Sequence, residues 1–308
     1  MNKHLLISEF LTTPWALMPE RLMAMSGVLH RWSAGEPPSD ETLFQIQSDR
    51  LLRDTRKQMA AANTGTGIAV LPLYGVVTQR GNMIDDISGP GSTSTQQFTA
   101  ALRQMLADDT VGQILIDIDS PGGSVYGVAE LATEIVKART QKPVVAVANS
   151  LAASAAYWIG CSASEFYVTP GGEVGSIGVW QAHFDYSKAL EEDGIKPTLI
   201  SAGKFKVEGN PYVPLDPEAQ AFMQSRVNDY YNAFVNAVAT GRGVSASVVR
   251  DGMGEGRVLG AEAALAANMV DGIATFDDVL ARMQKAIKAR QPMGASRLKQ
   301  ACSALALL

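Results

Sequence analysis

The sequence predicts an α/β protein whose body is a largely parallel sheet built from βαβ units. From residue 67 onward, short apolar runs that contain Val and Ile alternate with amphipathic stretches of helical length. Clusters of Gly, Pro, Ser and Asp separate these segments, as turns do. The pattern contains no internal repeat and no low-complexity tract. We therefore expect residues 66–285 to form one domain with right-handed crossovers.

In the first half of the body, strands and helices are expected to alternate. The runs IAVLPLYGVV, QILIDID and PVVAVA are short, apolar and β-branched, which is typical of buried strands. The stretches between them place apolar residues three and four positions apart, as one face of a helix requires. The predicted elements are a strand over 68–77, a helix over 95–106, a strand over 113–119, a helix over 125–139, a strand over 143–148, a helix over 152–160 and a strand over 165–169.

The second half continues with longer helices. The run GSIGVW and residues 197–200 have strand character, and Pro214 and Pro217 introduce a long helical stretch. The predicted elements are strands over 175–180 and 197–200, a helix over 216–240, a helix and turn over 258–271 and a last helix over 276–289.

Two terminal regions flank this body. Residues 1–65 are expected to be a helical arm, because 19–31 and 40–59 show helical spacing and the run GEPPSD separates them. Residues 286–308 form a C-terminal tail with a weaker pattern and an apolar end. The arm contains no catalytic constellation, so we expect it to dock on the body or on a partner.

The composition excludes several classes of function. A formal net charge of −5 gives no attraction to nucleic acid or to an anionic membrane, so neither is an expected partner. The two cysteines, Cys161 and Cys302, and only three histidines provide no disulfide framework and no cysteine-rich metal site. Apolar runs are too short for a membrane span or a signal peptide. We expect a soluble protein, synthesised in a cytoplasm, without metal or cofactor.

The first candidate for chemistry is the segment NSLAASAAYW, which follows a predicted strand. Small residues at a strand-to-helix junction allow a tight turn that presents one side chain, here the hydroxyl of Ser154, at a helix N-terminus. The amides and dipole of that terminus favour developing negative charge. The alternative is that an Ala- and Ser-rich helix only packs closely on the sheet.

The second candidate is the run DSPGG at residues 119–123. Two glycines after a strand let backbone N–H groups point into a cleft without obstruction, as an oxyanion hole needs. An ordinary β-to-α turn is the alternative. A phosphate-binding loop fits poorly, because no Gly-Lys-Ser/Thr follows.

A serine nucleophile needs a base, and two kinds are available. Ser154, His183 and Asp216 follow a Ser–His–Asp order, so a triad is one alternative. Lys204 and Lys206 in the run SAGKFKVEGNP are the other. A lysine becomes a base when burial in a dry cleft brings its pKa from about 10.4 towards neutrality. Taken alone, either lysine also fits a solvated loop.

Together these segments resemble the signal peptide peptidase A family of serine peptidases, and in particular its tailed-phage branch, the head-maturation proteases. The resemblance covers about residues 13–285. It implies a Clp/crotonase-like fold of stacked βαβ units, with a helical N-terminal arm and C-terminal helices, that forms a homo-oligomer. The matching segments are GIAVLPLYGVV, DIDSPGGSVYG, NSLAASAAYWIG, GSIGVWQAHFDYSKALEEDGI and TLISAGKFKVEGNPYVPL, with TPWALMPERLMAMSGVLHR similar to the arm of the phage proteins.

The resemblance also implies residue roles. The family nucleophile matches Ser154, and its lysine base, which lies a few residues before a proline, matches Lys206 and not Lys204. In short members of the family, the serine and the lysine come from neighbouring subunits. The oxyanion donors match the backbone N–H groups of Gly122, with Gly123, and of Ala155.

One position bears on the triad alternative. Related Clp-type peptidases place a histidine where Ser176 and Ile177 stand here, which weakens a histidine base and leaves His183 as a structural residue. We expect Ser176 to help orient the lysine amine.

The resulting prediction is a serine endopeptidase with a Ser/Lys dyad. Its expected substrates are scaffold, capsid or portal proteins within a phage prohead in the host cytoplasm, with the scaffold either a separate protein or a different segment. One alternative is a soluble bacterial peptidase that degrades signal peptides or other proteins in the bacterial cytoplasm. The others are a catalytically silent ring-forming assembly protein and an acyl-CoA-handling enzyme of the same fold.

Overall fold

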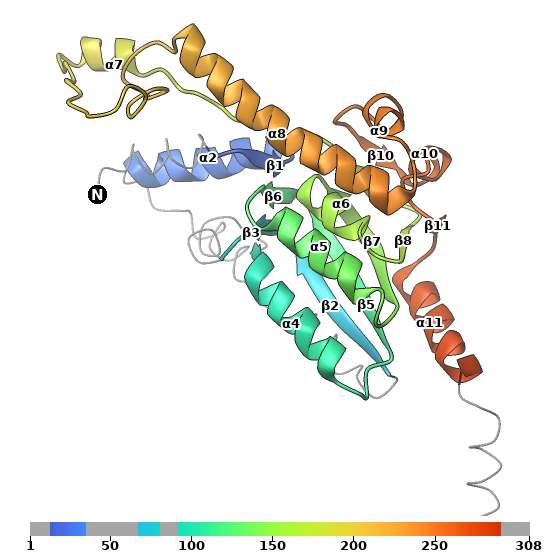
Figure 1. Cartoon of the computed structure of the whole chain (residues 1–308). Helices are drawn as coiled ribbons and strands as arrows, with labels where there is room; N and C mark the ends of the chain where they lie inside the picture. Colours follow the sequence, from blue (N-terminus) through green and yellow to red (C-terminus); the bar gives the residue numbers. More distant parts are fainter. Residues whose placement is uncertain (1–12, 35–66, 81–91, 291–308) are drawn as a thin grey trace, which may run out of the picture.

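The computed structural model describes residues 13–34, 67–80 and 92–290 (Figure 1). The helix expected over 40–59 and the tail from 291 lie outside these residues. The strands are β1 (Trp15–Leu17), β2 (Ile68–Tyr74), β3 (Val76–Thr78), β4 (Ser92–Ser94), β5 (Gln113–Ser120), β6 (Gly122–Ser124), β7 (Val144–Ala153), β8 (Glu165–Val168), β9 (Glu173–Gly175), β10 (Val258–Gly260) and β11 (Gly272–Ile273). The helices are α2 (Pro19–Ala34), α4 (Thr95–Ala107), α5 (Val128–Ala138), α6 (Ala155–Gly160), α7 (Ser187–Glu192), α8 (Pro217–Arg242), α9 (Ala246–Gly252), α10 (Ala261–Ala266) and α11 (Phe276–Arg290).

The main sheet is the parallel α/β sheet that the alternating pattern predicts. Its strand order is β10-β9-β7-β5-β2, and β8 joins β7 to β11. Strands β2, β5, β7, β8 and β9 pair in parallel, while β10 is antiparallel to β9. Strand β7 is long enough to pair first with β8 and then, nearer its carboxyl end, with β9.

A second, smaller sheet stands beside the first, in the order β1-β6-β3-β4. The single strand expected over 68–77 is therefore divided between two sheets. The division falls at Gly75, whose φ of +68° is a left-handed conformation that glycine adopts without steric cost. The turn brings β3 beside β6. Strand β6, which contains Gly122 and Gly123, therefore lies between β3 and β1.

The main sheet is covered on both faces. One face packs against α4, α5, α6 and α8, and it contains most of the apolar core. The strand residues that alternate with these point to the other face, which α11 covers. Val70, Leu115 and Val147 pack there against Val279 and Met283. This alternation is why the strands are apolar throughout and not every second residue.

Three predicted elements differ from the structure, two of them in their bounds and one entirely. Residues 152 and 153 were expected to begin a helix, but they extend β7, because they pair with β9 and their position in the sheet outweighs the low β-propensity of alanine. The strand expected over 175–180 ends at Gly175, with one further bridge from Trp180 to Trp15. Residues 197–200 form no regular structure and lie exposed.

Residues 183–216, which we call the extension, project from the body. They carry α7 and a long loop, and Figure 1 shows them beyond the N-terminal end of α8. Helix α8 begins at the cap residue Asp216, whose side chain accepts a hydrogen bond from the amide of Ala219. Its other half is packed on the body, where Phe234 stacks on Trp158 of α6 at a ring-centroid distance of 4.8 Å.

Candidate active site

Ser154 occupies a sharp turn between β7 and α6. Its φ of 55° and ψ of −119° are unusual for a residue with a side chain, and such backbone conformations cost about 1–3 kcal/mol. Two hydrogen bonds hold the turn: the Ser154 amide donates to Gly175 O at 2.7 Å, and the amide of Trp158 donates to Ser154 O at 3.0 Å. The surrounding sheet therefore imposes a strained, defined position on one serine, as sites for nucleophiles require.

The alanines beside Ser154 explain how that turn fits into the fold. Ala153, Ala155 and Ala156 have no exposed surface, and Ser154 itself is 1% exposed. Larger side chains here would overfill a closed core. The hydroxyl makes one long contact, from Oγ to Gly178 O at 3.4 Å.

Gly122 lies against the nucleophile. A Cβ atom on this residue would be 2.9 Å from Ser154 Cβ and 2.3 Å from Ala16 O, and its φ is +98°. A Cβ on Gly123 would be 1.9 Å from Val77 O. Only glycine fits at either position, and the close approach brings the β6 backbone to Ser154.

The amide of Gly122 has a partner in this structure. It donates to Ser120 Oγ at 3.2 Å, and the Ser120 hydroxyl in turn donates to Gly75 O at 2.6 Å. Ala155 supplies the first amide of α6, one of the four that a helix leaves without an intrahelical acceptor. The expected oxyanion donors Gly122 and Ala155 therefore lie on either side of Ser154, with the Gly122 amide turned to Ser120.

Lys206 is not brought to Ser154 within one chain. It is exposed in the extension, where its amide donates to Gly203 O. The neighbouring Lys204 forms an ion pair of 2.9 Å with Glu218 in the first turn of α8. From Glu218 to Phe234, which packs over α6, the helix rises about 24 Å at 1.5 Å per residue. Figure 1 shows the extension at the end of α8 that lies away from α6.

The residues of the histidine alternative are also apart from Ser154. His183 Nε2 lies 3.1 Å from Asn210 O within the extension, and the Asp216 carboxylate caps α8. One chain therefore assembles neither a Ser–His–Asp triad nor a Ser/Lys dyad.

Ser176 lies close to the nucleophile turn. It is 8% exposed, has a φ of 53°, and its amide donates to Arg257 O at 2.8 Å. The preceding residue, Gly175, provides the carbonyl that accepts the Ser154 amide. Ser176 is thus held rigidly near Ser154, on the side of the main sheet.

An open pocket of about 480 Å³ adjoins the nucleophile. Gly178, whose carbonyl contacts the Ser154 hydroxyl, forms part of its wall. Tyr231 and the charged residues Arg250, Asp251 and Glu255 line the rest.

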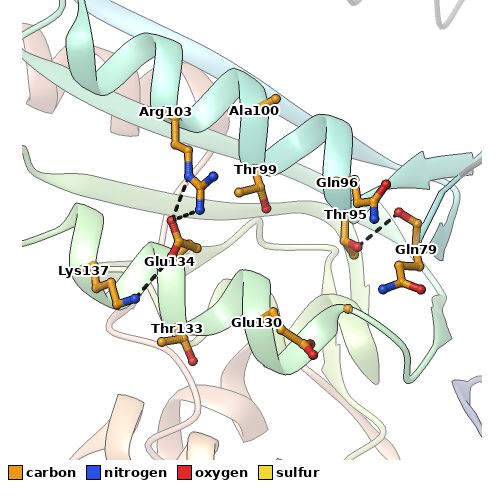
Figure 2. Close-up of a pocket in the computed structure, with 11 residues that line it drawn as sticks. Gln79, Thr95, Gln96, Thr99, Ala100, Arg103, Glu130, Thr133, Glu134 and Lys137 are labelled. Carbon is orange, nitrogen blue, oxygen red and sulfur yellow. Dashed lines mark hydrogen bonds and ion pairs between the residues drawn. The ribbon is translucent and has the colours of Figure 1, made fainter.

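A larger cavity of about 590 Å³ lies between α4 and α5 (Figure 2). Its wall carries an ion-pair network in which Glu134 contacts both Arg103 and Lys137. The hydrogen bond from Arg103 lowers the pKa of Glu134 despite some desolvation. The charges neutralise one another on exposed helix faces, so this cavity presents a solvated surface and no nucleophile.

Cys161 is not a competing nucleophile. Complete burial raises the pKa of its thiol to about 12, although Arg242 opposes the shift. A neutral buried thiol is unreactive. Among the described residues, no group of three His, Cys, Asp or Glu side chains is placed to bind a metal, and no helix is long and apolar enough to cross a membrane.

Comparison with known proteins identifies the family. The model of peptidase family S49 matches residues 137–290, which is half of the chain. The chain belongs to peptidase family S49. This match spans the nucleophile turn, the extension and α8, and so includes both Ser154 and Lys206.

Individual S49 relatives include phage and bacterial proteins. Capsid assembly protease C of Escherichia phage lambda is 36% identical over 77% of this chain and 53% of its own length. Head-tail preconnector protein GP5 of Enterobacteria phage P21 is 33% identical over 79% of this chain and 50% of its own length. A putative signal peptide peptidase SppA of Enterococcus faecium is 27% identical over 81% of this chain and 73% of its own length. The chain spans about half the length of the two phage relatives.

The sequence alone did not reveal strand β1 or the role of Gly178. The run TPWALMPE has only three residues of strand, too few for a periodic signal. Gly178 acts through its carbonyl, which every residue possesses. The proline at position 19 was the available sign that the arm helix begins there and that an extended segment precedes it.

Proposed function

We propose that this chain is a serine endopeptidase in which Ser154 of one subunit is activated by Lys206 of a neighbouring subunit. The observation that carries the proposal is the strained, enclosed position of Ser154 between Gly122 and the first amide of α6. Such a turn presents a nucleophile beside oxyanion donors. Membership of peptidase family S49 favours peptide bonds as the substrate.

The intersubunit arrangement follows from the extension. Lys206 is exposed there, and Glu218 at the adjoining start of α8 lies about 24 Å along the helix from Phe234, which packs on Trp158 of α6. The extension and the start of α8 also expose large apolar side chains that a lone chain leaves in water. These are Ile195 at 54%, Ile200 at 96%, Phe205 at 48%, Val213 at 49% and Phe222 at 51% exposed. A second copy of the chain would cover this surface and deliver the lysine together.

The pocket beside Gly178 suits the arrival of that lysine. Gly178, whose carbonyl contacts the Ser154 hydroxyl, forms part of its wall, and Asp251 and Glu255 would attract the lysine while it is still protonated. Ser176 follows Gly175, whose carbonyl accepts the Ser154 amide, and its hydroxyl would form a hydrogen bond with the amine and orient it. Two copies could exchange lysines reciprocally as a dimer, and a head-to-tail contact would form a ring where its rotation closes.

In the proposed reaction, the uncharged amine of Lys206 takes the proton of Ser154 as Oγ bonds to the peptide carbonyl carbon. The amides of Ala155 and Gly122 stabilise the oxyanion, the latter after leaving Ser120 Oγ. The C–N bond then breaks, and the lysine returns its proton to the departing amine. Water then takes the place of the departed amine. Lys206 accepts a proton from the water as its oxygen attacks the acyl carbonyl, and it returns the proton to Ser154 Oγ as the ester bond breaks.

The proposed substrates are proteins of phage head assembly. Two relatives carry the names capsid assembly protease and head-tail preconnector protein, and both align over more than three quarters of this chain. A second candidate is degradation of signal peptides or other proteins, which the similarity to a putative signal peptide peptidase favours at lower identity. The catalytically silent alternative is disfavoured by the strained turn, because strain without activity has no benefit.

The function is tested by incubating the chain with a phage head scaffold protein as substrate. Ser154→Ala should reduce cleavage at least about 10³-fold, because it removes the nucleophile, while the thermal midpoint stays close to that of the parent chain. Mass spectrometry of the products gives the cleaved bonds. Equal processing by Ser154→Ala would exclude Ser154 as the nucleophile, and cleavage of a signal peptide but not of scaffold would favour the second candidate.

A further inference from the structure

Strand β1 lies in a groove that leads to the nucleophile. On one side it pairs antiparallel with β6, in the register Trp15 to Ser124, Ala16 to Gly123 and Leu17 to Gly122. On the other side, the backbones of Trp15 and Trp180 exchange two hydrogen bonds of 2.9 and 3.0 Å. We call this space, between β6 and Trp180, the arm groove.

The arm groove borders the catalytic serine directly. A point at the Cβ position of Gly122 is 2.3 Å from Ala16 O and 2.9 Å from Ser154 Cβ, so the β1 backbone and the nucleophile meet at this glycine. Ser154 is 1% exposed with the arm in place. An extended polypeptide in this groove therefore passes beside Ser154 Oγ, and no second polypeptide fits there while β1 occupies it.

The contacts of β1 are those of a bound peptide as well as of a folded strand. Its main chain bonds to both sides of the groove, with further bonds from Met18 N to Pro121 O at 3.2 Å and from Trp180 Nε1 to Leu17 O at 2.9 Å. Adding a strand to a sheet edge is a common way to bind a peptide. Main-chain bonds give affinity for any sequence, and side-chain pockets select among sequences.

The side-chain environments define a pattern. Trp15 and Leu17 point to one face, where they pack with Val76 of β3 and with Trp180, as well as with residues of α2. Ala16 points to the other face, has no exposed surface and belongs to the main core. The groove thus accepts a large apolar residue, a small residue and a large apolar residue in sequence, ending opposite Gly122.

We propose that the arm groove is the substrate-binding groove of this chain and that β1 is its internal occupant, which substrates must displace. The ligand class is an extended peptide with a large–small–large apolar pattern, bound antiparallel to β6. The catalytic consequence rests on the proposed function of Ser154, while the binding itself does not. In the resting chain, β1 therefore blocks the site.

Peptide binding tests the groove without relying on catalysis. The probe is a fluorescein-labelled octapeptide with the sequence of residues 13–20, measured by anisotropy against full-length Ser154→Ala chain. Ala16→Pro in that chain removes an amide from a strand bonded on both sides, which disfavours β1 in the groove. We expect the probe to bind the Ala16→Pro chain at least about tenfold more tightly than the parent.

Two controls make the outcome specific. Trp15→Ser, which removes a buried anchor of β1, should open the groove in the same way, and Met23→Ala at a 68% exposed position of α2 should not. A probe in which alanine 16 is replaced by phenylalanine should lose binding, because the position is enclosed. Equal binding to the parent and to both opened chains, or binding to none, would overturn the inference.

Cleavage separates the two proposals. With Ser154 restored, Ala16→Pro should cleave fluorescent casein at least about fivefold faster than the parent chain, since release of β1 uncovers the nucleophile. Cleavage that is unchanged in Ala16→Pro would overturn the blocking role of β1. If the binding pattern holds but no chain with Ser154 cleaves casein or scaffold, the groove stands and the peptidase function fails.

Discussion

The region around Ser154 and the region around Lys206 are constructed in opposite ways. Ser154 is 1% exposed, lies between two sheets and an inner helix, and is surrounded by alanine and glycine. Lys206 is exposed in the extension, among apolar side chains that contact water, such as Ile200 at 96% exposed. One chain thus completes the surroundings of the nucleophile. In the proposed function, a second subunit would complete the surroundings of Lys206.

The largest expected effect separates the two lysines. Lys206→Ala should reduce proteolysis at least about 10²-fold, because it removes the general base. Lys204→Ala should retain most activity, since its ion pair with Glu218 is on the surface and such pairs contribute only about 0–1 kcal/mol. Initial rates on fluorescent casein give the comparison.

His183→Ala is the further control in that series, and it should retain activity. Loss of activity in Lys204→Ala with retention in Lys206→Ala would mean that the other lysine is the base. Loss in His183→Ala, without a change in thermal midpoint, would favour a histidine base.

The next effect compares two phenylalanines of α8. Phe234 is fully buried and stacks on Trp158, so Phe234→Ala should lower the free energy of unfolding by about 3–5 kcal/mol. Phe222 lies in the other half of the helix and is 51% exposed. Phe222→Ala should therefore change the free energy of unfolding by no more than about 0.5 kcal/mol. Urea unfolding of each variant measures these values.

For self-association the order of the two variants should be reversed, with the larger effect from Phe222→Ala. Light scattering with sedimentation should show that Phe222→Ala weakens self-association, because Phe222 belongs to the surface proposed to cover a neighbour. If Phe222→Ala instead unfolds the chain and assembles normally, the extension is part of the body and not an interface.

The smallest effect concerns the attachment of α8 to the body at Asp271. Burial opposes ionisation of this carboxylate, but the ion pair with Arg242 and the amide of Phe166 outweigh it and lower its pKa. Because the pKa of Asp271 is lower in the folded state, its ionised form stabilises the fold at pH values above the ordinary pKa of about 3.9. This stabilisation is lost as the pH falls through the folded-state pKa.

Asp271→Asn therefore should lower the thermal midpoint at pH 7 and make progressively less difference in acid. Because the side chain is 37% exposed, the effect at neutral pH should be about 1 kcal/mol or less. Differential scanning calorimetry between pH 7 and pH 3 measures it. If the thermal midpoints of the parent and of Asp271→Asn differ by the same amount over this whole pH range, the assigned ion pair is contradicted.

Much of the body could be predicted from residues 67–168, because strand and helix periods there are clear and each strand is buried on both faces. The turn at Ser154 was also expected, although the strand before it runs further than the sequence indicates. Alanine has little preference for strands, and only pairing with β9 extends β7 to Ala153.

The extension and the arm groove could not be predicted in this way. Residues 197–200 form no strand among the described residues and lie exposed, although their apolar character suggested one. Strand β1 is three residues long and depends on β6 and Trp180, which lie far away in the sequence. Such contacts are set by tertiary structure and leave no local period.

The central claim is that Ser154 and Lys206 meet across a subunit boundary. The most direct measurement mixes inactive Ser154→Ala and Lys206→Ala chains, dissociates them and lets them reassemble before casein is added. If each site takes its serine from one chain and its lysine from the next, an equal mixture should recover about a quarter of parent activity. If activity stays at the level of the separate variants while mixed oligomers form, the dyad is not shared between subunits.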